Sequence, residues 1–259
     1  MQRGIAVTGL ALGLTLSTAL VGCTANDGTD GGILVRKNVA AGAGCVTTGM
    51  PDEPGIAHGH LNALGLTGYL FIAQMSSRIS ALAGEESQRT IITKGANIDI
   101  TFPDSTAFSA AELTALQTAG LTRFRSLFAA PIEPNGGTTD AGFILMSGAL
   151  SAALLNKAAG APFALEAVAT FTVDGDMAGQ RVVSQPFAYP VTITSGGTLP
   201  SGGGGINNLG ACPLKMITNT GNVCNVFQDG VVDCCTDPAE VTESNPLGFV
   251  CPARVSTGA

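Results

Sequence analysis

The hexapeptide NIDITF, residues 97–102, alternates polar and apolar side chains without a break. Successive side chains of a strand point to opposite faces, so Ile98, Ile100 and Phe102 share one face and the polar residues share the other. An alternation with this period predicts a half-buried β-strand. The apolar face needs a second layer to cover it, and this requirement limits the possible architectures.

Residues 187–194, FAYPVTIT, alternate in the same way and predict a second strand of this kind. Pro186 and Pro190 have no N–H group to donate to a neighbouring strand. The two prolines therefore predict that this strand lies at a sheet edge or begins irregularly.

A hairpin is predicted where Val168–Asp174 (VATFTVD) is followed by Gly175 and Asp176 and the chain returns along Gln180–Ser184. Many short strands joined by turns predict a mainly β chain, folded as an antiparallel, immunoglobulin-like β-sandwich. Further strands are predicted at residues 33–40, 66–77 and 90–93.

One or two short helices interrupt this pattern. Ser109 and Glu112 have the spacing of a capping box, in which each side chain satisfies a free backbone amide of the other residue. A second helix is predicted at Ala149–Ala159, because Gly160 and Pro162 end it. Both helices are expected to pack on the sandwich as structural elements.

The first residues have the features of an export signal. Arg3 gives a positive start, and Gly4–Leu20 follows without a charged side chain. The next residues, LVGC at positions 20–23, resemble the lipobox of bacterial lipoproteins. That resemblance implies that residues 1–22 are a signal peptide and that Cys23 becomes the first mature residue, carrying acyl chains such as palmitate. The alternative is one membrane-spanning segment over residues 4–22, which contains enough residues to cross a bilayer.

Thr24 in the position after this cysteine resembles lipoproteins sorted to an outer membrane. The resemblance therefore implies a cell-envelope protein held at the outer membrane by its N-terminal lipid. Residues 23–32 are rich in Gly and acidic residues, which predicts a flexible tether.

Composition divides the rest of the chain into three parts. Residues 33–197 contain the predicted β-sandwich domain and one cysteine, residues 198–205 (TLPSGGGG) form a Gly-rich linker, and residues 206–259 form a Cys-rich tail module. The formal net charge is -7, from 12 basic and 19 acidic side chains. Nucleic-acid binding is not expected, because it depends on clustered Lys and Arg.

Six cysteines remain after Cys23, an even number in a chain expected to reach an oxidising compartment, so disulfide bonds are predicted. Five of them lie in residues 206–259, so at least one must pair outside the tail, and Cys45 is the only mature cysteine elsewhere. The sequence leaves the pairing open among 15 connectivities. The predicted disulfide cysteines are Cys45, Cys212, Cys224, Cys234, Cys235 and Cys251.

Two metal sites compete with this interpretation, although no metal site and no cofactor is expected. Four thiolates can bind zinc, but the usual paired spacing is missing. Oxygen-bearing residues near the cysteines can bind calcium, but Asn and Asp are also common turn residues. The zinc candidates are Cys212, Cys224, Cys234 and Cys235, and the calcium candidates are Asn222, Asn225, Asp229 and Asp233.

The chain has two histidines, His58 and His60, which would face the same side of a strand and could share a metal. Surface histidines in a Gly-rich loop are the competing interpretation. No nucleophile elbow, P-loop or dinucleotide fingerprint accompanies them. Paired acids are interpreted as surface charge; these are Asp52 and Glu53, Glu85 and Glu86, and Asp174 and Asp176.

The sequence therefore predicts a lipid-anchored envelope protein with a structural, adhesive or partner-binding role. Its expected partners are the membrane, through the N-terminal lipid, and a protein of the envelope or cell surface. No catalytic residue is predicted. The alternatives are an exported hydrolase or metal-dependent enzyme that uses His58 and His60, and an accessory lipoprotein of a secretion machine.

Overall fold

The computed structural model describes residues 30–47, 52, 54–103, 108–159, 161–195, 205–211, 221–242 and 249–250. The export signal, Cys23 with its tether up to residue 29, Cys212 and Cys251 lie outside these ranges. Within them, no helix is both long enough and apolar enough to span a bilayer.

The described chain is mainly β, as the sequence predicted. Its helical elements are short: η1 Ala43–Cys45, η2 Ala63–Gly65, α1 Glu86–Arg89, α2 Ala110–Thr118, α3 Gly148–Ala158 and η3 Pro238–Glu240. Its strands are β1 Asp30–Val39, β2 Gly55–Ile56, β3 Gly59–Asn62, β4 Tyr69–Ser77, β5 Ile91–Thr101, β6 Arg123–Ser126, β7 Pro131–Ile132, β8 Thr138–Met146, β9 Ala164–Met177, β10 Gln180–Ser184, β11 Phe187–Thr194, β12 Gly205–Ala211, β13 Val231–Thr236 and β14 Phe249–Val250.

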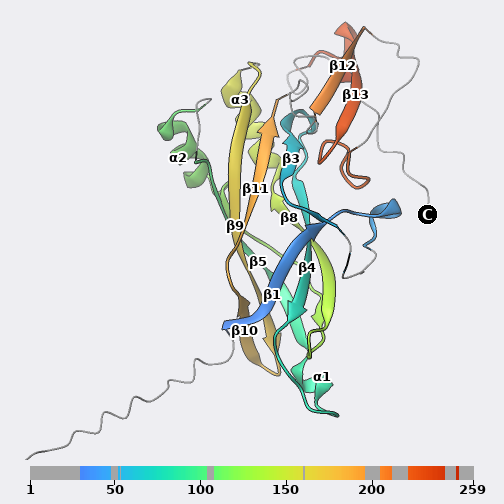
Figure 1. Ribbon diagram of the computed structural model, residues 1–259. Coiled ribbons are helices and arrows are strands. Elements are labelled where there is room, and N and C mark those ends of the chain that lie inside the picture. The colour runs from blue at the N-terminus through green and yellow to red at the C-terminus, as the bar shows by residue number, and fades with distance from the viewer. Residues whose placement is uncertain are drawn as a thin grey trace, which may run out of the picture.

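Eleven strands form one mixed sheet in which β9 has a central position (Figure 1). One edge of β9 pairs with β5, and the other pairs with β11 and then β10. From β10 the sheet continues through β1 and β4 to β8. The pairs β1–β10 and β3–β11 are parallel, so the expectation of a purely antiparallel arrangement is wrong. Parallel pairs join segments far apart in the chain, which local alternation cannot reveal.

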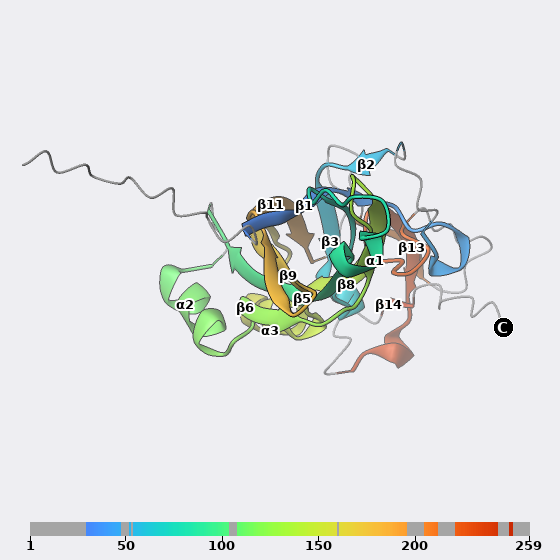
Figure 2. The same ribbon diagram turned by 90° about the horizontal axis from the view of Figure 1, so that it is seen from below.

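The sheet is strongly curled, so the apolar side chains of its two halves face each other and pack together as the core (Figure 2). The ring centroid of Phe71 in β4 lies 5.1 Å from that of Phe171 in β9 and 4.9 Å from that of Tyr189 in β11. Phe143 of β8 completes the layer, 5.5 Å from Phe71. The required second layer is thus supplied by the same sheet.

The alternation around NIDITF is confirmed, because Ile98 and Ile100 of β5 are 2% and 3% exposed. The hairpin of β9 and β10 is also confirmed, but its turn is at Ala178 and Gly179 and not at Gly175. Both turn residues have positive φ, 50° and 83°, as a tight two-residue hairpin turn requires. The prediction placed the turn too early because Gly175 is itself a strand residue.

The strand β11 has the predicted bounds, but it is an edge strand over only half of its length. It pairs with β9 throughout, and from Val191 onward it also pairs with β3. Pro190 lies just before this second pairing begins. The missing N–H group therefore falls where β11 has one strand neighbour among the described residues.

Both predicted helices are present. The Ser109 amide donates to Glu112 Oε2 at 2.8 Å, and the Ser109 side chain accepts from the Glu112 amide, so the capping box is complete. The predicted Ala149–Ala159 helix is α3, which begins after Ser147 as its N-cap residue.

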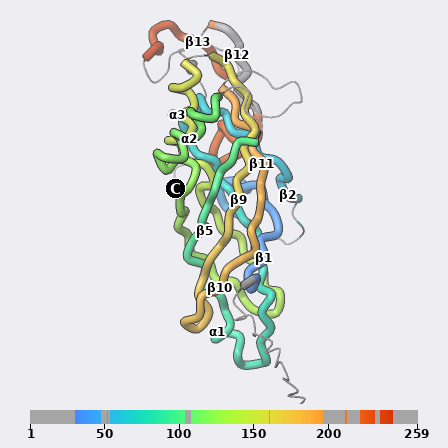
Figure 3. The backbone as a smooth tube through the Cα atoms, turned by 90° about the vertical axis from the view of Figure 1, so that its left-hand side faces the viewer, coloured from blue at the N-terminus to red at the C-terminus, as the bar shows by residue number. Residues whose placement is uncertain are grey.

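The body is elongated, and its two ends differ (Figure 3). The α1 end carries the turn of β9 and β10, whereas β12 and β13 lie at the opposite end. The strands β12, β13 and β14 form a second, three-stranded sheet.

Replacing Phe71 with Ala is expected to lower the free energy of unfolding by about 3 to 5 kcal/mol, because it leaves a cavity between the two halves of the sheet. Urea unfolding followed by circular dichroism measures the change. Leu127→Ala is the control, since Leu127 is 75% exposed, and its effect should stay within about 0.5 kcal/mol. Equal effects of the two substitutions would contradict the described core.

Candidate functional site

The strands β3 and β4 are joined by η2 but are not paired with each other in the described sheet. Residues 225–229, which we call the strap, fill the space between them. The Asn62 amide donates to the Phe227 carbonyl at 2.8 Å, and the Asp229 amide donates to the His60 carbonyl at 2.9 Å. The strap therefore pairs with β3 through its own main chain.

Side chains complete the attachment on the β4 side. Gln228 is fully buried, and its amide accepts from the Leu70 N–H at 2.9 Å and donates to the Leu70 carbonyl at 2.7 Å. Asn225 donates to the Gly68 carbonyl at 2.7 Å. Gln228 thus takes the place of a strand neighbour for Leu70, because it satisfies both backbone groups of that residue.

A buried polar cluster lies beneath the strap. The Tyr69 hydroxyl donates to both oxygens of Asp229, at 2.9 and 3.1 Å, and lies 3.0 Å from the Tyr189 hydroxyl. Asn38 donates to the hydroxyls of Tyr189 and Tyr69 at 2.9 and 3.1 Å, and its oxygen accepts from the Ile72 amide. These contacts join β1, β4, β11 and the strap in one network.

Burial determines the protonation states of this cluster. It raises the pKa of Tyr189 to about 12 and shifts the pKa of Tyr69 further upward, where Asp229 adds to the effect. Burial also raises the pKa of Asp229, although the hydrogen bonds from the His60 amide, Gln228 and Tyr69 oppose that rise. Both phenols are neutral at pH 7, so Tyr69 can serve as a hydrogen-bond donor to Asp229.

His60 lies beside this network, with Nε2 3.2 Å from the Thr194 hydroxyl and only 6% of the residue exposed. Burial, with a contribution from nearby His58, lowers its pKa to about 4. The imidazole is therefore neutral at pH 7. Its Nδ1 atom has no hydrogen-bond partner among the described residues.

His58 has a different environment, because its side chain is half-exposed. Its Nε2 lies 2.7 Å from the Thr192 hydroxyl and 3.6 Å from Glu166 Oε2. The Thr192 hydroxyl donates to Glu166. In a serine-hydrolase triad the hydroxyl donates to the histidine, so these three residues do not reproduce that order.

The described residues contain no group of three or more His, Cys, Asp or Glu side chains that could hold a metal ion. His58 and His60 therefore have no third ligand of these types in the described structure. Their nearest polar contacts are instead Thr192, Thr194 and Glu166, on β11 and β9.

The predicted disulfide bonding is confirmed for Cys45 and Cys224, which form a bridge across 179 residues of sequence. This bridge is not internal to a C-terminal tail, because it ties the strap region to η1 near the start of the body. Cys234 and Cys235 are also disulfide-bonded. Oxidised sulfurs are not thiolates, so the zinc interpretation is wrong for the three candidate cysteines in the described ranges.

The calcium candidates whose side chains are described have partners within the protein. Asn222 accepts from the Cys224 amide at 2.8 Å within a turn, and Asn225 accepts from the Thr67 hydroxyl at 3.1 Å. Asp229 is bound in the buried cluster, and the side chain of Asp233 lies outside the described structure. The competing interpretation, turn residues, therefore fits Asn222, whereas Asn225 and Asp229 bind the body through the strap.

The paired acids have structural partners where both members are described. Asp174 accepts two bonds from Arg125, at 2.6 and 3.0 Å. Asp176 accepts from the Gly179 amide at 2.9 Å in the hairpin turn. Glu85 pairs with Arg89 and Glu86 accepts from the Gly84 amide, while Glu53 lies outside the described residues.

The sequence did not single out Tyr69, Tyr189, Asn38 or Gln228. One signal was available, because the chain has only two tyrosines and both lie in the buried cluster. No protein-family model matches the sequence, and a search of characterised proteins finds no similar one.

Gln228→Leu should lower the free energy of unfolding by about 3 kcal/mol, because it leaves two buried backbone groups of Leu70 without partners. Urea unfolding measures the loss. Gln117→Leu on exposed α2 is the matched control, with an expected change within about 0.5 kcal/mol. If Gln228→Leu were as mild as its control, the strap would not be bound as described.

His60→Gln should weaken the acid sensitivity of the fold. The imidazole takes up a proton at its ordinary pKa of 6.5 when unfolded but only at about 4 when folded. The unfolded state therefore binds more protons in this window, and stability falls as the pH is lowered through it.

Between pH 7 and pH 4, His60 is expected to lower the free energy of unfolding by about 3 kcal/mol. Asp229, with its raised pKa, acts in the opposite direction in both proteins, so the difference between wild type and variant isolates His60. Urea unfolding at both pH values measures it. Parallel pH profiles of the two proteins would refute a buried, neutral His60.

Proposed function

We propose that this chain is a lipid-anchored protein of the bacterial cell envelope, attached through Cys23 and sorted to the outer membrane. The sequence support is the LVGC motif after an uncharged stretch, followed by Thr24. Attachment through several acyl chains provides stable membrane binding, which one chain does not. The proposed role is structural, adhesive or partner-binding.

The LVGC motif carries this proposal, and the position of Asp30, the first described residue, indicates which end of the body would face outward. The register of β1 with β4 pairs Ile33 with Ser77 and Asn38 with Ala73, so Asp30 lies beyond the Ser77 end of β4. The strap contacts the other end of β4, at Leu70. A lipid at Cys23 would therefore leave the strap end of the body free to face outward.

We also propose that residues 206–259 form a disulfide-rich segment. The bridge between Cys45 and Cys224 supports this part of the proposal, since it fixes the strap region to the body.

The outward end offers a surface for a protein partner of the envelope. Val46 and Val223 are the chain neighbours of the two bridged cysteines, and they are 61% and 51% exposed. The buried cluster, in contrast, has its hydroxyl, amide and carboxylate groups engaged in holding the strap. A binding role therefore fits the outward end better than the cluster.

Cys23→Ala should release the protein from envelope membranes into the soluble fraction, because the acyl chains supply the attachment. Flotation of membranes followed by mass spectrometry of the N-terminal peptide measures both location and acylation. Cys45→Ala is the control, since Cys45 lies in the folded body, and it should leave flotation unchanged. An unmodified, uncleaved N-terminus in the wild-type protein would disprove the proposal.

A further inference from the structure

We propose that residues 79–90, which we call the tip loop, touch the surface of the bilayer that holds the acyl chains of Cys23, with Leu82 as the inserted side chain. This inference rests on the proposed lipid anchor. The tip loop connects β4 to β5 and contains α1.

The tip loop begins beside the place where β1 begins. The Arg78 amide donates to the Gly32 carbonyl at 2.9 Å. The Ile79 side chain lies over Gly32, where a Cβ atom would meet Ile79 Cδ1 at 3.2 Å. The chain that leads back to Cys23 therefore leaves the body next to the tip loop.

Chain length restricts which end of the body can reach the membrane. Seven residue steps separate Cys23 from Asp30, and they span at most about 25 Å. The strap contacts β4 at Leu70, seven residues from Ser77, whereas the tip loop begins two residues after Ser77. The tip loop lies at the end of the body where β1 begins (Figure 1), so it is closer than the strap to the point where the chain leads back to Cys23.

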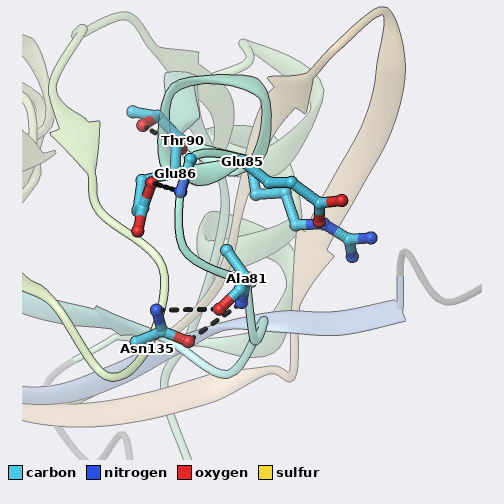
Figure 4. Close-up of polar contacts among 7 residues, drawn as sticks. Ala81, Glu85, Glu86, Thr90 and Asn135 are labelled. Carbon is cyan, nitrogen blue, oxygen red and sulfur yellow. Dashed lines mark hydrogen bonds and ion pairs between the residues drawn. The ribbon is translucent and has the colours of Figure 1, made fainter.

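The tip loop has a defined conformation, which Figure 4 shows. The Asn135 side chain accepts from the Ala81 amide at 2.9 Å and donates to the Ala81 carbonyl at 3.2 Å. The main-chain N–H of Asn135 donates to the Ile79 carbonyl. On the other side of the turn, Glu86 accepts from the Gly84 amide at 2.7 Å. Binding through this loop therefore costs little conformational entropy.

Leu82 occupies the turn that these contacts hold. Its carbonyl accepts from the Glu85 amide at 3.0 Å, while the residue is 73% exposed. Leu82 is thus a large apolar side chain presented to solvent on an ordered turn. An apolar side chain at a headgroup boundary is removed from water, which favours contact with the bilayer.

Charge does not oppose this contact. The tip loop contains one arginine and two glutamates, so its formal charge is -1, which Arg78 directly before it balances, whereas the whole chain carries -7. Arg89 and Glu85 also pair with each other at 3.4 Å. The tip loop with Arg78 is therefore less acidic than the average of the chain, which lowers the repulsion from anionic headgroups.

The test uses the absence of tryptophan from the chain, which makes Leu82→Trp a single fluorescent reporter. The full-length lipidated protein is reconstituted into vesicles of phosphatidylethanolamine and phosphatidylglycerol, with and without brominated acyl chains. The Trp emission should shift to the blue and lose roughly half of its intensity to bromine, as expected for a side chain at the headgroup boundary.

Val223→Trp is the matched control, because Val223 is 51% exposed and lies next to the strap. Its emission should neither shift nor be quenched. If the Leu82→Trp protein floats with the vesicles but its emission matches the control, the membrane contact is disproved and the lipid anchor stands. If wild-type protein purified from its envelope carries no lipid and does not float, the anchor fails, and the membrane contact fails with it.

Discussion

The fold depends on how the strap closes the space between β3 and β4. Without the strap, the edge of β3 and the backbone groups of Leu70 would lack protein partners at the end of an apolar core, and backbone groups without partners are costly where water cannot reach them. The strap satisfies β3 with its main chain and Leu70 with the Gln228 amide. A segment almost 160 residues distant from β4 in sequence thereby becomes part of the main body.

Two further features keep the strap in place. The buried Asp229 side chain is held by Tyr69, whose hydroxyl also contacts Tyr189, so its oxygens are hydrogen-bonded although burial raises the pKa of this carboxyl. The bridge between Cys45 and Cys224 closes a loop of 179 residues, which in the chain-entropy account contributes about 5 kcal/mol. Hydrogen bonds thus set the position of the strap, and the disulfide limits how far it can move when those bonds open.

The sequence predicted several local elements because their signals are local, but it missed β8 and divided β5 into two predicted strands. Alternation located β5 and β11, and the capping box of Ser109 and Glu112 located α2. The parallel pairs and the curl of the sheet could not be predicted, since they depend on which distant strands meet. The buried cluster was missed for the same reason: Tyr69 and Tyr189 are separated by 120 residues, and neither one alone is unusual.

Native-state hydrogen exchange tests the central claim that the strap is part of the body. The amides of Asn62 and Asp229, which form the backbone bonds between the strap and β3, should exchange with the same opening free energy as core amides of β9, because releasing the strap exposes the end of the core. Exchange of these two amides through a local opening of much lower free energy, while β9 stays protected, would contradict the account.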